Sequence, residues 1–216
     1  MPAFPEGRHH GTTVPLDRAN VDTDAIFPKQ YGRGTARSGY GPVLFDSWRY
    51  LDPGDLTTDH STRRLDPDFV LNQAALQGAS VLLARDNFGC GSSREHAVWA
   101  LRDYGIKAVV APSFGDIFRQ NCAVNGVAAL ALSAQALTTL FDLAQVQTLH
   151  LDIDLHAAVL RSGPHTWPLH LTPRELHLLT HDTDWIAATL AQRDLIAQFE
   201  SARLSQKPWL APTLDP

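Results

Sequence analysis

Short apolar runs alternate with amphipathic stretches through the middle of this 216-residue chain. Runs of valine, leucine, isoleucine and alanine with the length of buried strands lie at 81–84, 106–111 and 127–132. Apolar residues at helical spacing follow them, and the predicted helices lie at about 92–104, 113–124 and 133–143. Strands that alternate with helices in this way are joined by right-handed crossovers. The pattern therefore predicts an α/β domain with parallel central strands.

The two ends of the chain are less periodic. Residues 1–19 are rich in proline, glycine and arginine, and a first strand is predicted near 11–14. Segments 149–160 and 166–171 are predicted to pair as a hairpin, and helical segments follow them. We therefore expect an α/β domain over residues 1–171 and a C-terminal helical extension over residues 172–216 that packs on it.

A glycine-rich turn joins the strand at 81–84 to its helix and reads Gly89-Cys90-Gly91-Ser92-Ser93-Arg94-Glu95. Ser92 followed three residues later by Glu95 fits a capping box, which predicts a helix start at about Ser92 or Ser93. The free N–H groups of a helix start, the glycines and the forked donor of Arg94 together suit a carboxylate or a phosphate. The alternative is that Ser92 only caps the helix, Ser93 is solvated and Arg94 forms a surface ion pair.

Composition narrows the possible classes of protein. A hydrophobic content of 44% suffices for one sizeable core, and a net charge of −5 argues against nucleic-acid binding. No apolar run approaches the roughly 20 residues of a membrane span, so we expect no membrane contact and a cytoplasmic protein. Two cysteines, Cys90 and Cys122, make a disulfide framework unexpected and are too few to hold an iron–sulfur cluster.

Five segments of the chain carry a resemblance to a known family. The run DNFGCGSSREHA at 86–97 closely resembles the signature of the swivel domain of the aconitase superfamily. The segments at 20–31, 44–51, 67–72 and 111–126 resemble, in the expected order, small subunits of bacterial 3-isopropylmalate dehydratase. The resemblance covers nearly the whole chain. It implies the aconitase-type swivelling β/β/α fold, with parallel central strands and a C-terminal hairpin and helical tail.

The resemblance also implies an activity. Enzymes of this family interconvert 2-isopropylmalate and 3-isopropylmalate through 2-isopropylmaleate, a dehydration and rehydration in leucine biosynthesis. By the match within the signature, Ser92 would carry the catalytic hydroxyl, Ser93 would assist it, and Arg94 would hold a substrate carboxylate beside the backbone of Gly91. The Lewis acid would be a [4Fe–4S] cluster held by a separate large subunit, the expected partner, and no metal is expected in this chain.

The resemblance assigns the substrate's side group to the segment after Asn20-Val21-Asp22-Thr23-Asp24. The candidate substrate-binding residues there are Lys29, Gln30, Tyr31 and Arg33. The sequence departs from the family at this point, because Tyr31-Gly32-Arg33-Gly34 replaces a pattern similar to Phe-Leu-Lys-Arg. The missing leucine removes an apolar contact for an isopropyl group. Arg33 could instead pair with a third carboxylate, as in homoaconitase-like relatives, and citraconate hydratases are a further alternative.

Several other features favour a structural role over a chemical one. Asp22 and Asp24 could form a metal-binding pair but are more typical of a turn whose carboxylates bind nearby backbone. His177 and His181 have a zinc-compatible spacing, but no third ligand lies nearby in the sequence. Cys90 is expected to pack and not to act as a nucleophile. A non-enzymatic anion-binding module remains the alternative from another class of protein.

Overall fold

The computed structural model describes residues 3–33, 36–181 and 185–211. It divides into two compact units, Met1–His181 and Asp182–Pro216. The first unit ends at His181, ten residues beyond the boundary predicted at 171, because the helix at Pro173–Thr180 belongs to it. Its neighbour there is the helix that carries Arg119, whose side chain donates to Glu175 at 2.7 Å. The predicted packing of the extension on the first unit stays a prediction.

One mixed sheet of seven strands forms the centre of the first unit, in the order β4-β3-β2-β1-β5-β6-β7. The strands are β1 Arg8–Pro15, β2 Val81–Leu83, β3 Ala108–Ala111, β4 Ala128–Ala131, β5 His150–Asp154, β6 Val159–Ser162 and β7 His165–Pro168. Strands β1 to β4 pair in parallel and β5 to β7 in antiparallel fashion. The predicted parallel central strands are therefore confirmed.

Strand β1 is where the sheet changes direction. Residues Arg8–Thr12 pair antiparallel with β5, whereas Thr13–Pro15 pair parallel with β2. This double pairing makes β1 longer than the strand predicted at 11–14. The predicted hairpin also needs correction, because 149–160 folds into two strands, β5 and β6, around a turn that includes Ala158 at φ +53°. The hairpin partners are β6 and β7.

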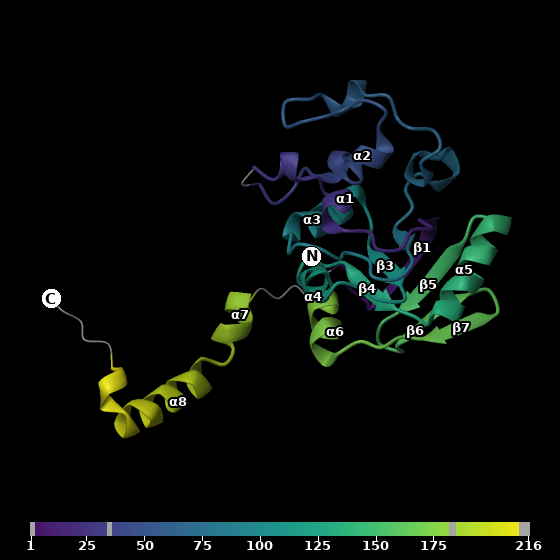
Figure 1. Ribbon diagram of the computed structural model, residues 1–216. Coiled ribbons are helices and arrows are strands. Elements are labelled where there is room, and N and C mark those ends of the chain that lie inside the picture. The colour runs from purple at the N-terminus through teal and green to yellow at the C-terminus, as the bar shows by residue number, and fades with distance from the viewer. Residues whose placement is uncertain (1–2, 34–35, 182–184, 212–216) are drawn as a thin grey trace. The chain divides into compact units, whose positions relative to one another are not determined.

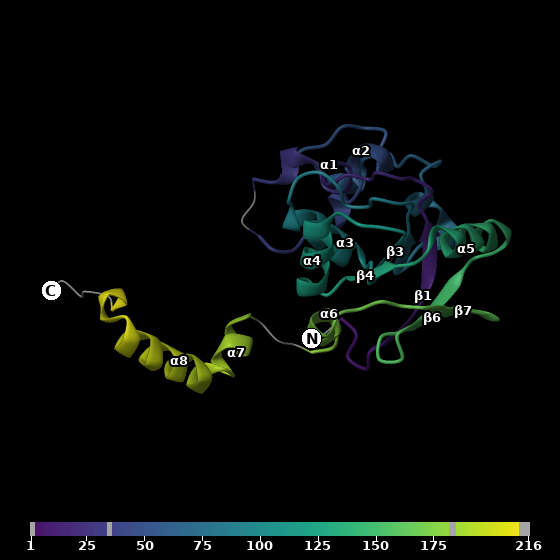
Figure 2. The same ribbon diagram turned by 60° about the horizontal axis from the view of Figure 1, so that its bottom comes forward.

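Within the first unit, helices cover both sides of the sheet (Figures 1 and 2). The helices of the two units are α1 Thr23–Ile26, α2 Asp46–Arg49, α3 Glu95–Tyr104, α4 Asp116–Val124, α5 Ala134–Val146, α6 Pro173–Thr180, α7 Trp185–Leu190 and α8 Arg193–Gln206. Helices α3, α4 and α5 are close to the three predicted ones. In Figure 1, α1, α2 and α3 gather at one end of the first unit, and α5 packs against β1 and β3.

Alternation along the strands builds two hydrophobic cores. Leu82 and Val109 belong to the core that α3 and α4 cover, together with Leu101 and Phe118. The next residues along the strands, such as Leu83, face the other core, which α5 covers. Because neighbouring side chains of a strand point to opposite faces, a fully apolar run such as 81–83 is what a sheet covered on both faces requires.

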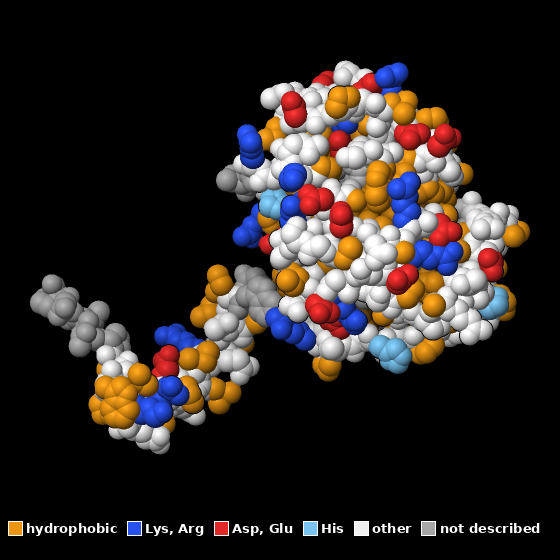
Figure 3. All heavy atoms as spheres, in the orientation of Figure 1, with side chains coloured by type: hydrophobic (Ala, Val, Ile, Leu, Met, Phe, Trp, Pro, Cys, Tyr) orange, Lys and Arg blue, Asp and Glu red, His pale blue; other side chains and the backbone are white. Residues whose placement is uncertain are grey.

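The second unit consists of α7 and α8 and a single turn at Pro208–Leu210. Its apolar side chains are exposed, as Figure 3 shows. They include Ile186, Leu190, Leu195, Phe199, Trp209 and Leu210. No helix among the described residues has the length and apolar character needed to cross a membrane.

Candidate functional site

The signature loop, residues 86–94, leaves the carboxyl end of β2 and is held by backbone hydrogen bonds on both sides. Gly89 N donates to Val21 O at 2.7 Å, and Thr23 N donates to Cys90 O at 2.9 Å. On the opposite side, Gly115 N donates to Phe88 O at 2.9 Å. The loop therefore continues the parallel sheet beyond its strands, between the segments that follow β1 and β3. Carboxyl ends of parallel strands are where open α/β sheets place ligands.

Gly89 is required by both conformation and space. Its φ of +73° is rarely adopted by other residues, and a Cβ atom there would collide with the ring of Phe118. The close contact lets the loop lie directly on α4. The loop backbone at Gly89 is thus packed on α4, whereas the other end of the loop, at Ser92 and Ser93, is exposed to solvent.

Helix α3 begins at Glu95, so the predicted start at Ser92 or Ser93 is wrong. Arg94 occupies the N-cap position and makes no side-chain capping bond. The capping box does not form because Glu95 has another partner: its Oε1 accepts a hydrogen bond from Asn125 Nδ2 at 2.9 Å. The same Asn125 accepts from Trp99 Nε1 at 2.8 Å. Ser92 is therefore free of the helix and lies in the loop before it.

The tip of the loop is open to solvent. Gly91, Ser92 and Ser93 are exposed and Arg94 is partly exposed. Thr23 Oγ1 donates to the backbone oxygen of Ser92 at 2.8 Å and lies 3.4 Å from its Oγ. The backbone of Ser92 is thus anchored to α1 while its hydroxyl remains accessible. These are the properties that a residue acting on a small molecule needs.

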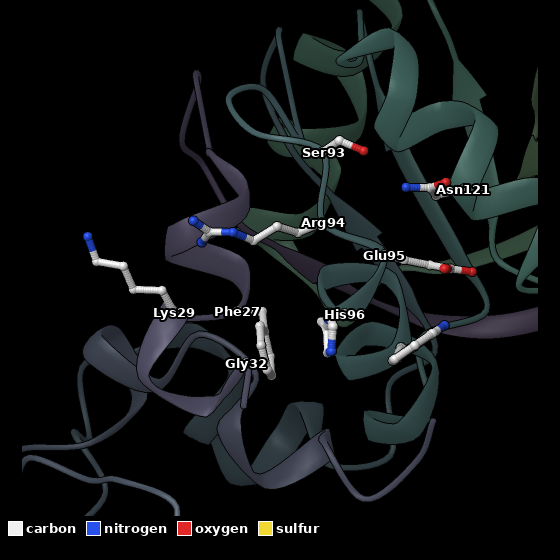
Figure 4. Close-up of a pocket in the computed structure, with 9 residues that line it drawn as sticks. Phe27, Lys29, Gly32, Ser93, Arg94, Glu95, His96 and Asn121 are labelled. Carbon is white, nitrogen blue, oxygen red and sulfur yellow. The ribbon is translucent and has the colours of Figure 1, made fainter. Parts of the chain in front are cut away.

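A hollow of about 520 Å³ opens beside the loop (Figure 4). It is lined by Phe27, Lys29, Gly32, Ser93, Arg94, Glu95, His96, Trp99 and Asn121. We call it the first hollow. In Figure 4, Arg94 extends toward the segment that carries Lys29, and Glu95 extends to the opposite side. Two cationic side chains and one carboxylate line this space, and the two cations suit an anionic ligand.

Arg94 is already paired in this structure. Its guanidinium donates to the carboxylate of Asp24, and both side chains remain partly exposed. Asp22 instead accepts from Ala25 N at 2.6 Å and caps α1. The predicted turn role is therefore confirmed for Asp22, whereas Asp24 contacts a residue 70 positions away. A substrate carboxylate that binds Arg94 would compete with Asp24 or share the guanidinium with it.

The four residues predicted to face the substrate side group separate in the structure. Lys29 lines the first hollow, and Lys29, Gln30 and Arg33 line a second one. Tyr31 is only 2% exposed, which corrects its assignment as a substrate-binding residue. Its ring packs near those of Phe27 and His60. Burial, followed by the neighbouring carboxylate of Asp46, raises the pKa of Tyr31 above its ordinary value.

Three residues of this region were not predicted from the sequence: Asp24 as the partner of Arg94, and His96 and Asn121 as lining residues. His96 directly follows the glycine-rich turn, so its position was a usable signal. Its ring stacks on Phe27 with centroids 5.2 Å apart and lies 4.6 Å from Trp99. Asn121 comes from the middle of α4, and no local pattern marks it.

The cysteines and the other described residues of this chain do not form a ligand set for an iron–sulfur cluster. Cys122 lies on the buried face of α4, and burial raises the pKa of its thiol well above the ordinary value. Cys90 lies in the loop and is partly exposed. Within the described part of the chain, no group of three or more potential ligands could hold a metal ion. His177 and His181 stack on each other at 4.4 Å.

Comparison with known proteins defines the class. The family described as the aconitase C-terminal domain matches residues 6–135, and the C-terminal domain of the 3-isopropylmalate dehydratase small subunit matches residues 186–213. A crystal structure of 3-isopropylmalate dehydratase from Methanocaldococcus jannaschii is similar to this chain at 25% identity and a TM-score of 0.60. The match covers 89% of this chain and 99% of the archaeal one. Aconitase X from Thermococcus kodakaraensis matches at 12% identity and a TM-score of 0.38, over 72% of this chain and 90% of that one.

Because the first match spans more than half of the chain, the chain belongs to the family of aconitase C-terminal domains. The predicted superfamily and fold are confirmed. The match in the C-terminal unit and the archaeal structure narrow the class further. Within the family, the chain is a small subunit of the 3-isopropylmalate dehydratase type, which is a hydro-lyase.

Proposed function

We propose that this chain completes the active site of a 3-isopropylmalate dehydratase when it binds a separate large subunit in the cytoplasm. The reaction would interconvert 2-isopropylmalate and 3-isopropylmalate through 2-isopropylmaleate. The observation that carries the proposal is the first hollow, where Lys29 and Arg94 lie beside the exposed Ser92-Ser93 tip. Two cations in one space suit a substrate with two carboxylates.

Each polar residue has a role that its position allows. Arg94 would bind one carboxylate through its planar fork, with Asp24 orienting the guanidinium. Lys29 is exposed, makes no ion pair with any described residue and would attract the second carboxylate. Ser92 would exchange the carbon-bound proton through its exposed hydroxyl, while Thr23 Oγ1 holds the backbone oxygen of the same residue. Ser93 and the backbone of Gly91 would position the substrate.

The reaction calls for a Lewis acid at the departing hydroxyl, and the described residues offer no group of three or more metal ligands. We propose that a [4Fe–4S] cluster is provided by the large partner. Helix α3 begins three residues beyond Ser92, so Ser92 is not part of the helix start that the sequence predicted. Arg94 is the nearest guanidinium in sequence that could stabilise an alkoxide at Ser92.

The homoaconitase-type alternative is not favoured. It would use Arg33, which lines the second hollow, to bind a third carboxylate. The family matches also point to 3-isopropylmalate dehydratases. A non-enzymatic anion-binding module would share the exposed loop but would require neither Ser92 nor a partner.

The test is reconstitution of the pair from this chain and the large subunit. We expect hydration of 2-isopropylmaleate by the pair, none by this chain alone, and a loss of about 10²–10⁴-fold in kcat for Ser92→Ala. Thr138→Ala is the matched control, because it removes an exposed hydroxyl from α5. Activity of the lone chain, or wild-type kinetics for Ser92→Ala, contradicts the proposal.

A further inference from the structure

A second hollow of about 630 Å³ lies between the segment 29–33 and the connection that follows α2. It is lined by Lys29, Gln30, Arg33, Asp55, Leu56 and Thr57. Leu56 is the one apolar residue among these six, and its side chain is 52% exposed. An exposed leucine surrounded by polar residues in a hollow is available to an apolar group of a ligand.

The turn that presents Leu56 is rigidly held. Asp55 Oδ1 accepts hydrogen bonds from Thr57 N at 2.8 Å, from Thr57 Oγ1 at 2.8 Å and from Thr58 Oγ1 at 2.9 Å. Asp55 N in turn donates to Thr58 Oγ1 at 2.9 Å. Leu56 lies between the two residues that are tied together, so its backbone is ordered before any ligand binds. Such ordering reduces the entropy that binding would cost.

The base of this connection rests on Tyr31. A Cβ atom at Gly54 would collide with the Tyr31 hydroxyl and with Arg63, so the connection passes directly over the buried ring. Arg63 is itself buried, pairs with Asp46 and donates to the backbone oxygen of Asp52. Tyr31 thus fixes the distance between the segment 29–33 and the turn that carries Leu56. This explains why a residue predicted to face substrate is buried.

Lys29 lines both hollows. Consider a ligand whose two carboxylates bind at Arg94 and Lys29. A substituent on the carbon beside the carboxylate at Lys29 would then extend into the second hollow. The substrate class of the proposed function has this shape, because it combines two carboxylates with one branched aliphatic group. The segment 29–33 offers Gly32 and Arg33 to that group and no apolar side chain, since Tyr31 is buried.

We propose that Leu56 determines specificity for the branched aliphatic group of the substrate. The apolar contact missing from the segment 29–33 is then supplied by a different part of the chain. This inference rests on the proposed function and names a residue that contacts the substituent, not one that takes part in proton transfer. Leu56 is exposed, so its replacement leaves the core intact.

The experiment compares two substrates in the reconstituted pair. Citraconate carries a methyl group where 2-isopropylmaleate carries an isopropyl group, and the two are otherwise alike. We expect Leu56→Ala to lower kcat/KM for 2-isopropylmaleate roughly tenfold and to leave kcat/KM for citraconate within about twofold. Leu56→Met, which keeps an apolar side chain of similar size, should restore most of the preference.

The matched control is Leu51→Ala, because Leu51 is 54% exposed and does not line the second hollow. If Leu56→Ala lowers kcat/KM equally for both substrates, or for neither, the inference is overturned. The proposed function still holds in that case, provided that the wild-type pair hydrates 2-isopropylmaleate. A wild-type pair that does not hydrate 2-isopropylmaleate shows instead that the proposed function fails, and this inference fails with it. The two failures are therefore distinguished before any variant is measured.

Discussion

The signature loop and the segment 29–33 face the same hollow but are held in opposite ways. Hydrogen bonds from the backbone of both neighbouring segments fix the loop, and its side chains at Ser92 and Ser93 remain free. The segment 29–33 is fixed by one side chain, Tyr31, which is inserted into the core below the connection that carries Gly54.

This difference separates the effects of substitution in the two places. In the signature loop, a side chain can change without loss of the backbone bonds that hold it, so a substitution should affect activity more than stability. At Tyr31, a substitution removes buried contacts and should affect stability first. Segments that line one hollow can therefore contain exposed residues that affect activity and buried residues that affect stability, and the exposed fraction of each side chain distinguishes the two.

The largest expected effect is in the signature loop. Arg94→Lys keeps the positive charge but loses the planar fork that binds a carboxylate with two parallel bonds. We expect about a hundredfold loss of kcat/KM in the reconstituted pair, with a change in unfolding free energy within about 0.5 kcal/mol. Steady-state kinetics and urea unfolding measure the two quantities.

The control for Arg94 is Arg8→Lys, which makes the same change in the Arg8–Asp154 ion pair at the antiparallel half of the sheet. It should leave kcat/KM unchanged. If Arg94→Lys instead loses stability and keeps its kinetics, the Arg94–Asp24 pair is structural and the comparison between the two regions is wrong.

The next effect concerns stability. Tyr31→Ala should lower the unfolding free energy by about 3 kcal/mol, because it leaves a cavity in the core, whereas Gln30→Ala at an exposed neighbour should cost less than about 0.5 kcal/mol. Tyr31→Phe should be neutral or stabilising by up to about 1 kcal/mol, since the buried hydroxyl has no hydrogen-bond partner among the described residues. Denaturant titration measures all three, and a Tyr31→Phe variant that is stable but inactive would show that the hydroxyl has a chemical role.

The smallest effect is a dependence on pH. Burial, followed by the charge of Arg63, lowers the pKa of His60 below its ordinary value of 6.5. Below pH 6.5 the imidazole of His60 is therefore protonated more readily in the unfolded chain than in the folded protein. The stability that the neutral ring contributes is complete above pH 6.5 and is lost as the pH falls below this value. Because His60 is partly exposed, solvent screening limits the effect to less than about 1 kcal/mol.

The pH effect is measured as the difference in unfolding free energy between about pH 7.5 and about pH 5. His60→Gln should lose less stability over this interval than the wild type. His9 has a pKa that burial also lowers, so the same acid sensitivity remains in part in the variant. Equal losses in both proteins would show that protonation of His60 does not contribute to the acid sensitivity.

Much of the fold was predictable because its signals are local. The apolar runs at β2, β3 and β4 alternate with helices, and this periodicity follows from the two faces of a strand and the turn of a helix. The exposed Ser92-Ser93 tip was also predictable, since glycines and hydroxyls occur together at the end of a strand. The helix start was not, because Glu95 had two possible partners and the one that it binds, Asn125, lies 30 residues away.

The sequence by itself determined the order of the elements, the family and the position of the signature loop. Only the tertiary structure decided that Tyr31 is buried, that Asp24 pairs with Arg94, and that Leu56 and Arg33 line the same hollow. The physical reason is that burial and pairing depend on which distant segments meet. Hydrophobicity and hydrogen-bonding capacity are properties of a residue, whereas the partner that satisfies them is a property of the fold.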